Sequence, residues 1–145
     1  MKTRLLILLT ATLVAISSVS AQENAGSGNF MLPLCRTWLR IHSEDLATIK
    51  AEISGEIGVA LSRFEKAGLC AGFVIGVSEM LTMMSASPTP GMPSACIPKD
   101  ANNDQLVRAV VNFADRHPEI THEDFVVLVG AAMSVAWPCP KTTKP

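Results

Sequence analysis

Two stretches of the chain decide the fold: "ACIPKDANNDQLVRAVVNFADRHPEI", residues 95–120, and "AWPCP", residues 136–140. The first places Cys96 just ahead of an amphipathic helix, and the second places Cys139 just after another helix. Asn102 and Gln105 have the spacing of a capping box, which predicts a helix start at Asn102. Pro118 disfavours helical backbone at the residue before it, so this helix ends near His117.

A last helix follows the "HPEI" break. Thr121 is a suitable N-cap, and the sequence "FVVLVGAAMSVAW" after it contains one polar side chain, Ser134. A helix that is apolar on all sides is buried on all sides. We therefore expect it to be the central element of a bundle or part of a subunit interface, with Pro138 ending it.

The arrangement of these two helices predicts how the cysteines pair. A short turn joins the helices, so they run antiparallel and Cys96 lies beside Cys139. A disulfide there would close a loop of 44 residues, worth about 4 kcal/mol by the chain-entropy estimate. By elimination Cys35 pairs with Cys70, although four cysteines allow three connectivities. A zinc site is disfavoured, because no two cysteines are close in sequence as metal ligands usually are.

Three further helices are expected upstream. The first begins at Phe30, with Asn29 as a cap. The second spans residues 43–68, capped by Ser43 and ended by Gly68, with a bend expected at its internal glycines. The third, residues 70–84, is apolar nearly all round; we expect a buried helix, because it is shorter than a membrane span and contains Glu79. The sequence thus predicts an all-α fold, a small disulfide-stapled bundle of about five helices.

The N-terminus indicates export. Residues 1–21 combine two basic residues, an apolar run of about 12 residues and small residues before Gln22, which is the pattern of a secretory signal peptide. Cleavage would leave 124 residues with ten basic and 13 acidic side chains, a net charge of −3. We expect a flexible leader at 22–29, one helical domain at 30–140 and a tail at 141–145. An even number of cysteines in an exported chain favours disulfides.

Composition and motifs exclude several functions. The chain is not basic enough to suggest nucleic acid, and no polybasic run suggests a membrane surface after signal cleavage. "GVSEM" around Ser78 lacks the second glycine of a nucleophile elbow, so we interpret Ser78 as a buried helix serine. The histidines, at 42, 117 and 122, lack metal-ligand spacing. Glu79 is interpreted as a carboxylate paired with a nearby polar group. We therefore expect no enzyme activity, no metal and no cofactor.

The stretch "SASPTPGMPSA", residues 85–95, contains three prolines and a glycine and cannot be regular structure. It is the one long irregular loop expected in the chain. Long ordered loops tend to carry function.

Several motifs together resemble the Rap/Tai-type immunity proteins, which have an HdeA-like helical fold. The resemblance rests on Cys-Ile-Pro at 96–98, a helix opening with Gln105 and Leu106, His-Pro-Glu at 117–119 and Trp-Pro-Cys at 137–139. Upstream, "CAGFVIGV" and "NFMLPLC" resemble the family's earlier segments. The stretch between the first two cysteines, residues 43–68, and the 85–95 loop are longer than the family pattern, which leaves partner specificity open.

The resemblance implies a periplasmic, commonly homodimeric protein that binds a type VI-secreted peptidoglycan amidase and occludes its active site. It also implies that a projecting loop does the occluding. The candidate partner-binding residues are Ser87, Pro88, Thr89, Pro90, Gly91, Met92 and Pro93, although this segment could equally be a simple connector.

A second interpretation is a periplasmic stress or chaperone-type binding protein, as the HdeA-like fold suggests. That activity would need apolar surface to become exposed when carboxylates are protonated in acid. One scaffold can host both functions, so the fold alone does not choose between them.

Overall fold

The computed structural model describes residues 26–86 and 93–140. Within these residues the chain forms five α-helices and one short 3-10 helix, and no strand. The helices are α2 (Gly28–Ser43), α3 (Leu46–Gly55), α4 (Ile57–Ala86), α5 (Asn103–Arg116) and α6 (Phe125–Ala136), with η1 (Pro118–Ile120) between the last two. The predicted all-α bundle is confirmed.

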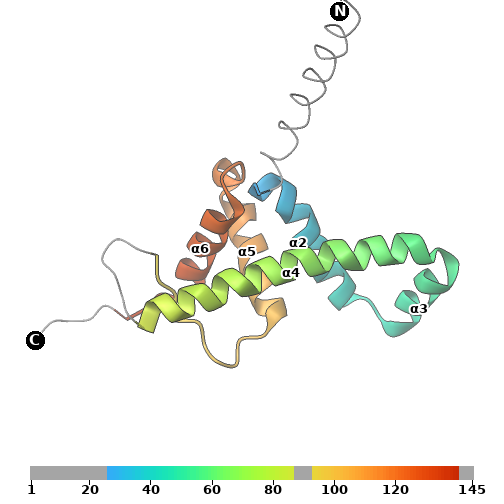
Figure 1. The fold of residues 1–145 in the computed structure, drawn as a ribbon, viewed down its shortest axis with the longest axis horizontal. Coiled ribbons are helices and arrows are strands. Elements are labelled where there is room, and N and C mark those ends of the chain that lie inside the picture. The colour runs from blue at the N-terminus through green and yellow to red at the C-terminus, as the bar shows by residue number, and fades with distance from the viewer. Residues whose placement is uncertain (1–25, 87–92, 141–145) are drawn as a thin grey trace, which may run out of the picture.

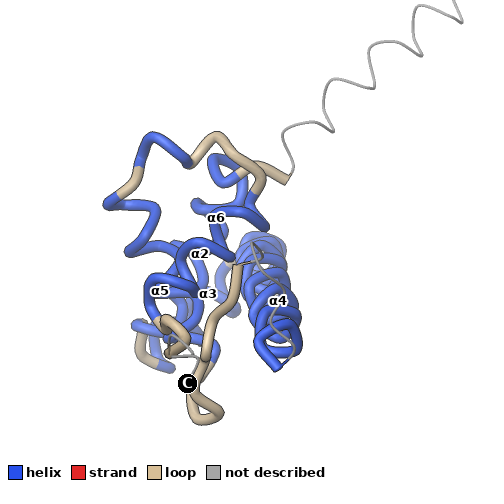
Figure 2. The backbone as a smooth tube through the Cα atoms, turned by 90° about the vertical axis from the view of Figure 1, so that its left-hand side faces the viewer, coloured by secondary structure: helices blue, strands red, loops and turns tan. Residues whose placement is uncertain are grey.

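Helix α4 is the longest element, with 30 residues, or about 45 Å at 1.5 Å per residue. Helices α2, α5 and α6 pack against one side of it, as both views show (Figures 1 and 2). The short α3 lies at the N-terminal end of α4 and buries none of its own residues (Figure 1).

The core lies between α4 and the three helices beside it. Each of these helices contributes apolar side chains that are almost completely buried. They include Met31 and Leu32 from α2, Val74 and Leu81 from α4, Val107 and Val110 from α5, and Phe125, Leu128 and Met133 from α6. Removing such a set from water is the main term that stabilises a bundle of this size.

Both predicted disulfides are present. Cys35 is bonded to Cys70, which fixes α2 to α4, and Cys96 is bonded to Cys139, which joins the segments before α5 and after α6. The Cα atoms are 5.1 Å apart in the first pair and 4.9 Å apart in the second. Helices α5 and α6 meet at their outer ends as the sequence argument required.

The start of α5 also follows the prediction. The Asn102 side chain accepts a hydrogen bond from the backbone N–H of Gln105, and the Gln105 side chain accepts one from Asn102, each at 2.9 Å. The helix ends at Arg116, and Pro118 opens the 3-10 turn.

The predicted start of the last helix is wrong, and within one chain the helix is not buried on all sides. The Thr121 hydroxyl donates to the carbonyl oxygen of Pro118 at 2.9 Å, which closes the 3-10 turn, and α6 begins only at Phe125. The helix is buried along one side, while Val126, Val127 and Val135 are exposed. Its apolar composition therefore exceeds what packing within one chain requires.

The predicted division between the second and third helices is also wrong. The chain runs as a continuous helix through Gly68 and breaks instead at Glu56, whose φ of −134° and ψ of 81° are not helical. A helix-ending glycine acts by adopting positive φ, and none is found at Gly68. Asp45 caps α3, and Ser43, the predicted cap, ends α2.

The length argument against a membrane span consequently fails. Helix α4 is long and apolar enough to cross a membrane by length and composition. One side of it nevertheless carries Cys70, Val74 and Leu81, which are fully buried against the other helices. Core helices of helical bundles pass the same length and composition test, and α4 is fixed to α2 by the Cys35–Cys70 disulfide while its opposite side stays exposed.

Residues 26–29, placed in the expected leader, are ordered against the start of α6. The Gly26 carbonyl accepts from Phe125 N–H at 2.7 Å, and the Gly28 N–H donates to Glu123 at 2.9 Å. A Cβ on Gly28 would lie 2.6 Å from the carbonyl oxygen of Thr121, so only glycine permits this close approach. Helix α2 therefore starts two residues before the predicted Phe30, with Ser27 as its N-cap.

Candidate partner-binding surfaces

The predicted loop is described at its two ends. Ser87, Pro88, Thr89, Pro90, Gly91 and Met92 lie outside the described residues, and Pro93 is described and exposed. Helix α4 extends to Ala86, so the first two residues of the expected irregular stretch are helical.

The described ends of this segment are held together by Ser85. Its hydroxyl lies 2.8 Å from the carbonyl oxygen of Leu81 and 2.9 Å from that of Ala95, and it accepts from the Ala95 N–H at 3.2 Å. Ala95 is fully buried. The Ser85 side chain, in the last turn of α4, thus anchors the chain where it returns to the bundle.

The disulfide strengthens the same base. Cys96 N–H donates to the Trp137 carbonyl at 2.9 Å, and Cys139 Sγ lies 3.9 Å from Ser85 Oγ. The Cys96–Cys139 bond therefore joins the segment that follows the loop to the C-terminal segment. The end of α4 lies against both through Ser85. A partner contact made by residues between 86 and 95 would therefore be made next to a point, Cys96, that a disulfide fixes covalently.

A second candidate surface is the outer side of α4. Leu69, Met80 and Met83 are 53%, 45% and 75% exposed and recur at helical spacing. Gly72 and Gly76 lie between them, and a Cβ added at either would meet nothing within 4 Å. We call these five residues the α4 stripe. Contiguous exposed apolar surface on a small protein commonly marks an interaction site.

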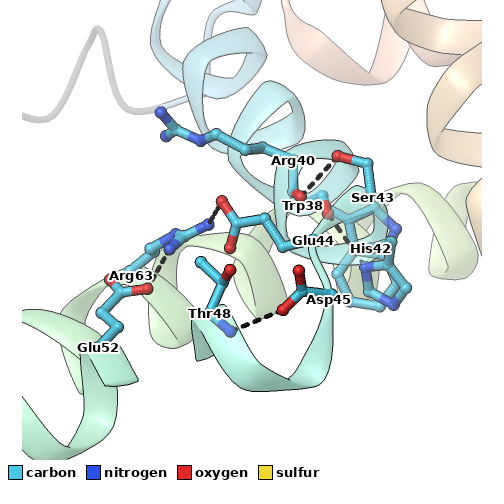
Figure 3. Close-up of polar contacts among 9 residues, drawn as sticks. All are labelled: Trp38, Arg40, His42, Ser43, Glu44, Asp45, Thr48, Glu52 and Arg63. Carbon is cyan, nitrogen blue, oxygen red and sulfur yellow. Dashed lines mark hydrogen bonds and ion pairs between the residues drawn. The ribbon is translucent and has the colours of Figure 1, made fainter. Parts of the chain in front are cut away.

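The third feature is an ion-pair cluster where α2, α3 and α4 meet (Figure 3). The Arg63 guanidinium, from α4, pairs with Glu44 at 2.6 Å and also with Glu52 of α3. All three side chains are about four-fifths buried. This cluster attaches the otherwise unburied α3 to the bundle. Glu44 Oε2 and Arg63 Nε are buried without a hydrogen-bond partner among the described residues.

A groove of about 460 Å³ lies beside this cluster, between α2 and α4. Its side-chain lining includes Thr37 and Arg40 from α2 and Ser62, Arg63 and Lys66 from α4. The lining has three cationic side chains and no acidic one.

Hydrogen bonds and ion pairs shift three pKa values. The pKa of Arg63 is raised, chiefly by its hydrogen bond to Glu44. The pKa of Asp45 is lowered, because the Thr48 N–H donates to its carboxylate at the α3 N-cap. The pKa of Glu119 is lowered by a backbone hydrogen bond and by the neighbouring His117. The first keeps the cluster charged, and the second stabilises the start of α3.

The residues weighed for catalysis do not form a reactive constellation in the described part of the chain. Ser78 is 3% exposed and donates to the Val74 carbonyl at 2.8 Å, which confirms a buried helix serine. Glu79 is exposed, in contrast to the paired carboxylate that we expected. His117 contacts Glu119, and His42 stacks on Trp38. No group of three potential metal ligands occurs among residues 26–86 and 93–140.

The described residues form an all-helical bundle with two disulfides and with exposed apolar and cationic surfaces. The family model for Rap1a immunity proteins matches residues 28–139. The chain therefore belongs to the Rap1a immunity protein family, whose members bind an effector protein. Neither the curated proteins nor the solved structures gave a match.

Sequence reasoning missed two of the three surfaces. The α4 stripe was missed because the predicted helix 70–84, apolar nearly all round, was expected to be buried on every side, whereas Met80 and Met83 are exposed. The cationic groove depends on residues of two helices brought together by the Cys35–Cys70 bond. The one signal of this groove in the sequence is Arg40, a basic residue one turn before the end of α2.

Proposed function

We propose that this protein neutralises a type VI-secreted peptidoglycan amidase in the periplasm by binding it and occluding its active site. The match to the immunity family over 28–139 carries the proposal. Two disulfides support an oxidising compartment, and the N-terminal pattern supports export. The protein acts as a binding module and performs no chemistry.

The experiment that tests this function is inhibition. Stoichiometric addition of the purified protein to its cognate amidase abolishes cleavage of peptidoglycan, and the two proteins elute together in size-exclusion chromatography. The control is an amidase of another class, which stays active. Full amidase activity at a tenfold excess of the protein contradicts the proposal.

We assign the occluding role to the segment between Ser85 and Ala95. Its base is held by the Ser85 hydrogen bonds and the Cys96–Cys139 disulfide. A preorganised base reduces the entropy lost when a loop orders on a partner. Deleting residues 88–93 should weaken amidase binding at least tenfold, whereas unchanged affinity would make the segment a connector.

We also propose that the protein is a homodimer in which the α4 stripe of one copy packs against that of the other. Glycines let two helices approach closely because they have no Cβ, and both glycines of the stripe face open space. The stripe extends over 14 positions, about 21 Å of α4, and a stable interface buries roughly 800 Å² per partner, so side chains flanking the stripe also contribute.

Analytical ultracentrifugation tests this dimer. The wild-type protein should sediment as a dimer at micromolar concentration, and the variant L69E/M83E should sediment as a monomer. Leu46→Glu is the matched control, because Leu46 is exposed on α3, outside the stripe. A monomeric wild type, or a dimer that survives L69E/M83E, excludes this arrangement.

A further inference from the structure

The cationic groove between α2 and α4 is separate from the occluding segment. Arg63 and Ser85 are 22 positions apart on one helix, which corresponds to about 33 Å. A partner contact in the groove would therefore be a second contact, made at the opposite end of the bundle from the proline-rich segment.

The groove offers hydrogen-bond donors and positive charge. Among the described residues, the charged groups of Arg40 and Lys66 form no ion pair or hydrogen bond, and Ser62 has no hydrogen-bond partner for its hydroxyl. Figure 3 shows the Arg40 guanidinium apart from the Arg63 cluster. The Thr37 hydroxyl already donates to Pro33, which leaves its oxygen available as an acceptor.

Arg63 gives the groove a fixed cationic wall. Its guanidinium is held in place by Glu44 and Glu52, which lie outside the groove lining. Its charge is largely balanced by these carboxylates, so Arg40 and Lys66 provide the attraction for an incoming anion. This cationic surface occurs on a chain whose formal net charge is −1, so it is a local feature and does not reflect a generally basic protein.

The groove can accommodate a ligand larger than a small inorganic anion. Its volume of about 460 Å³ is far larger than an inorganic anion needs, since a water molecule occupies roughly 30 Å³. The exposed Val59 adds an apolar wall. A peptide with neighbouring carboxylates matches both the charge and the volume.

We propose that the groove lined by Arg40, Ser62 and Lys66 binds an acidic segment of the partner protein. The inference rests on the proposed function, in that the partner is the effector. It adds a second docking point whose chemistry is carboxylate recognition by two unpaired cations. Charge complementarity of this kind raises the association rate and contributes specificity.

The test uses the peptide acetyl-Asp-Glu-Asp-amide and isothermal titration or NMR titration of the purified protein. Acetyl-Asn-Gln-Asn-amide is the neutral control, and inorganic phosphate is the small-anion control. The acidic peptide should bind with shifts confined to the groove, and the neutral peptide should not bind. Because an exposed charge pair is worth up to about 1 kcal/mol, Arg40→Gln and Lys66→Gln should each weaken binding about fivefold.

Lys99→Gln is the matched control, since Lys99 is an exposed lysine outside the groove lining. Equal binding of the neutral peptide, unchanged binding in both groove variants, or binding of phosphate alone would each overturn the inference. Circular dichroism of the variants establishes that they are folded. Because no effector is present in this assay, a negative peptide result does not contradict amidase inhibition. In the same way, a lack of amidase inhibition does not contradict a positive peptide result.

Discussion

Removing the Cys96–Cys139 disulfide should destabilise the protein by a calculable amount. The bond joins residues 43 positions apart and so closes a 44-residue loop. The chain-entropy estimate gives a loss of about 4 kcal/mol for C96S/C139S. That is a large fraction of the roughly 5–15 kcal/mol by which a domain is stable.

The other disulfide provides the comparison. Cys35 and Cys70 are 35 positions apart, so the loop entropy is nearly the same, about 4 kcal/mol. Their side chains are fully buried in the core, whereas Cys96 is exposed. Replacing both core cysteines with alanine also leaves unfilled space, which adds about 1–2 kcal/mol. C35A/C70A should therefore be the less stable variant.

Guanidinium denaturation followed by circular dichroism measures both losses. The free energies extrapolated to water are compared, because removing a cross-link also changes the slope of the transition. A loss below about 1 kcal/mol for C96S/C139S, against the estimate of about 4, would refute the reasoning. So would a C35A/C70A variant more stable than C96S/C139S.

Three further predictions concern the bundle itself. Gly28→Ala should cost about 1–3 kcal/mol in thermal or chemical unfolding, because the new Cβ would meet a backbone oxygen at 2.6 Å; equal stability of Gly28→Ala and the unobstructed Gly26→Ala would contradict this. Arg63→Met should cost about 1–3 kcal/mol by leaving two part-buried carboxylates unpaired, and the exposed Arg108→Met about 0.5 or less; equal losses would refute the cluster's role. The lowered pKa of Asp45 means that its cap stabilises the fold above its unfolded pKa and is lost as the pH falls through the lower folded value; an NMR titration midpoint at or above 3.8 would contradict it.

Features set by local rules could be predicted from the sequence. The capping box at Asn102 and Gln105 depends on residues three apart, and the Pro118 break depends on its neighbour. The disulfide pairing followed because a short connection forces α5 and α6 to be antiparallel, which brings Cys96 to Cys139.

Features set by packing could not be predicted in this way. Gly68 resembles a helix end locally, yet the buried side chains on either side of it, Ala67 and Cys70, hold α4 as one helix. The α4 stripe was missed for a different reason, because an all-round apolar segment was expected to be fully buried, and Met80 and Met83 are exposed. The cluster around Arg63 joins residues 11 and 19 positions apart, a distance at which no sequence pattern indicates contact.

The occluding segment also combines a feature that the sequence predicts with one that depends on packing. Its composition predicted an irregular loop, but the role of Ser85 in fixing both ends depends on the return of the chain to the end of α4. The sequence indicated where the segment is, and the structure indicates how it is supported.

The most direct test of the central claim is titration of the cognate amidase with this protein while peptidoglycan cleavage is followed. The account predicts complete inhibition at one immunity protein per amidase, with the complex recovered intact by size-exclusion chromatography. Undiminished cleavage in the presence of excess folded, disulfide-bonded protein would contradict it.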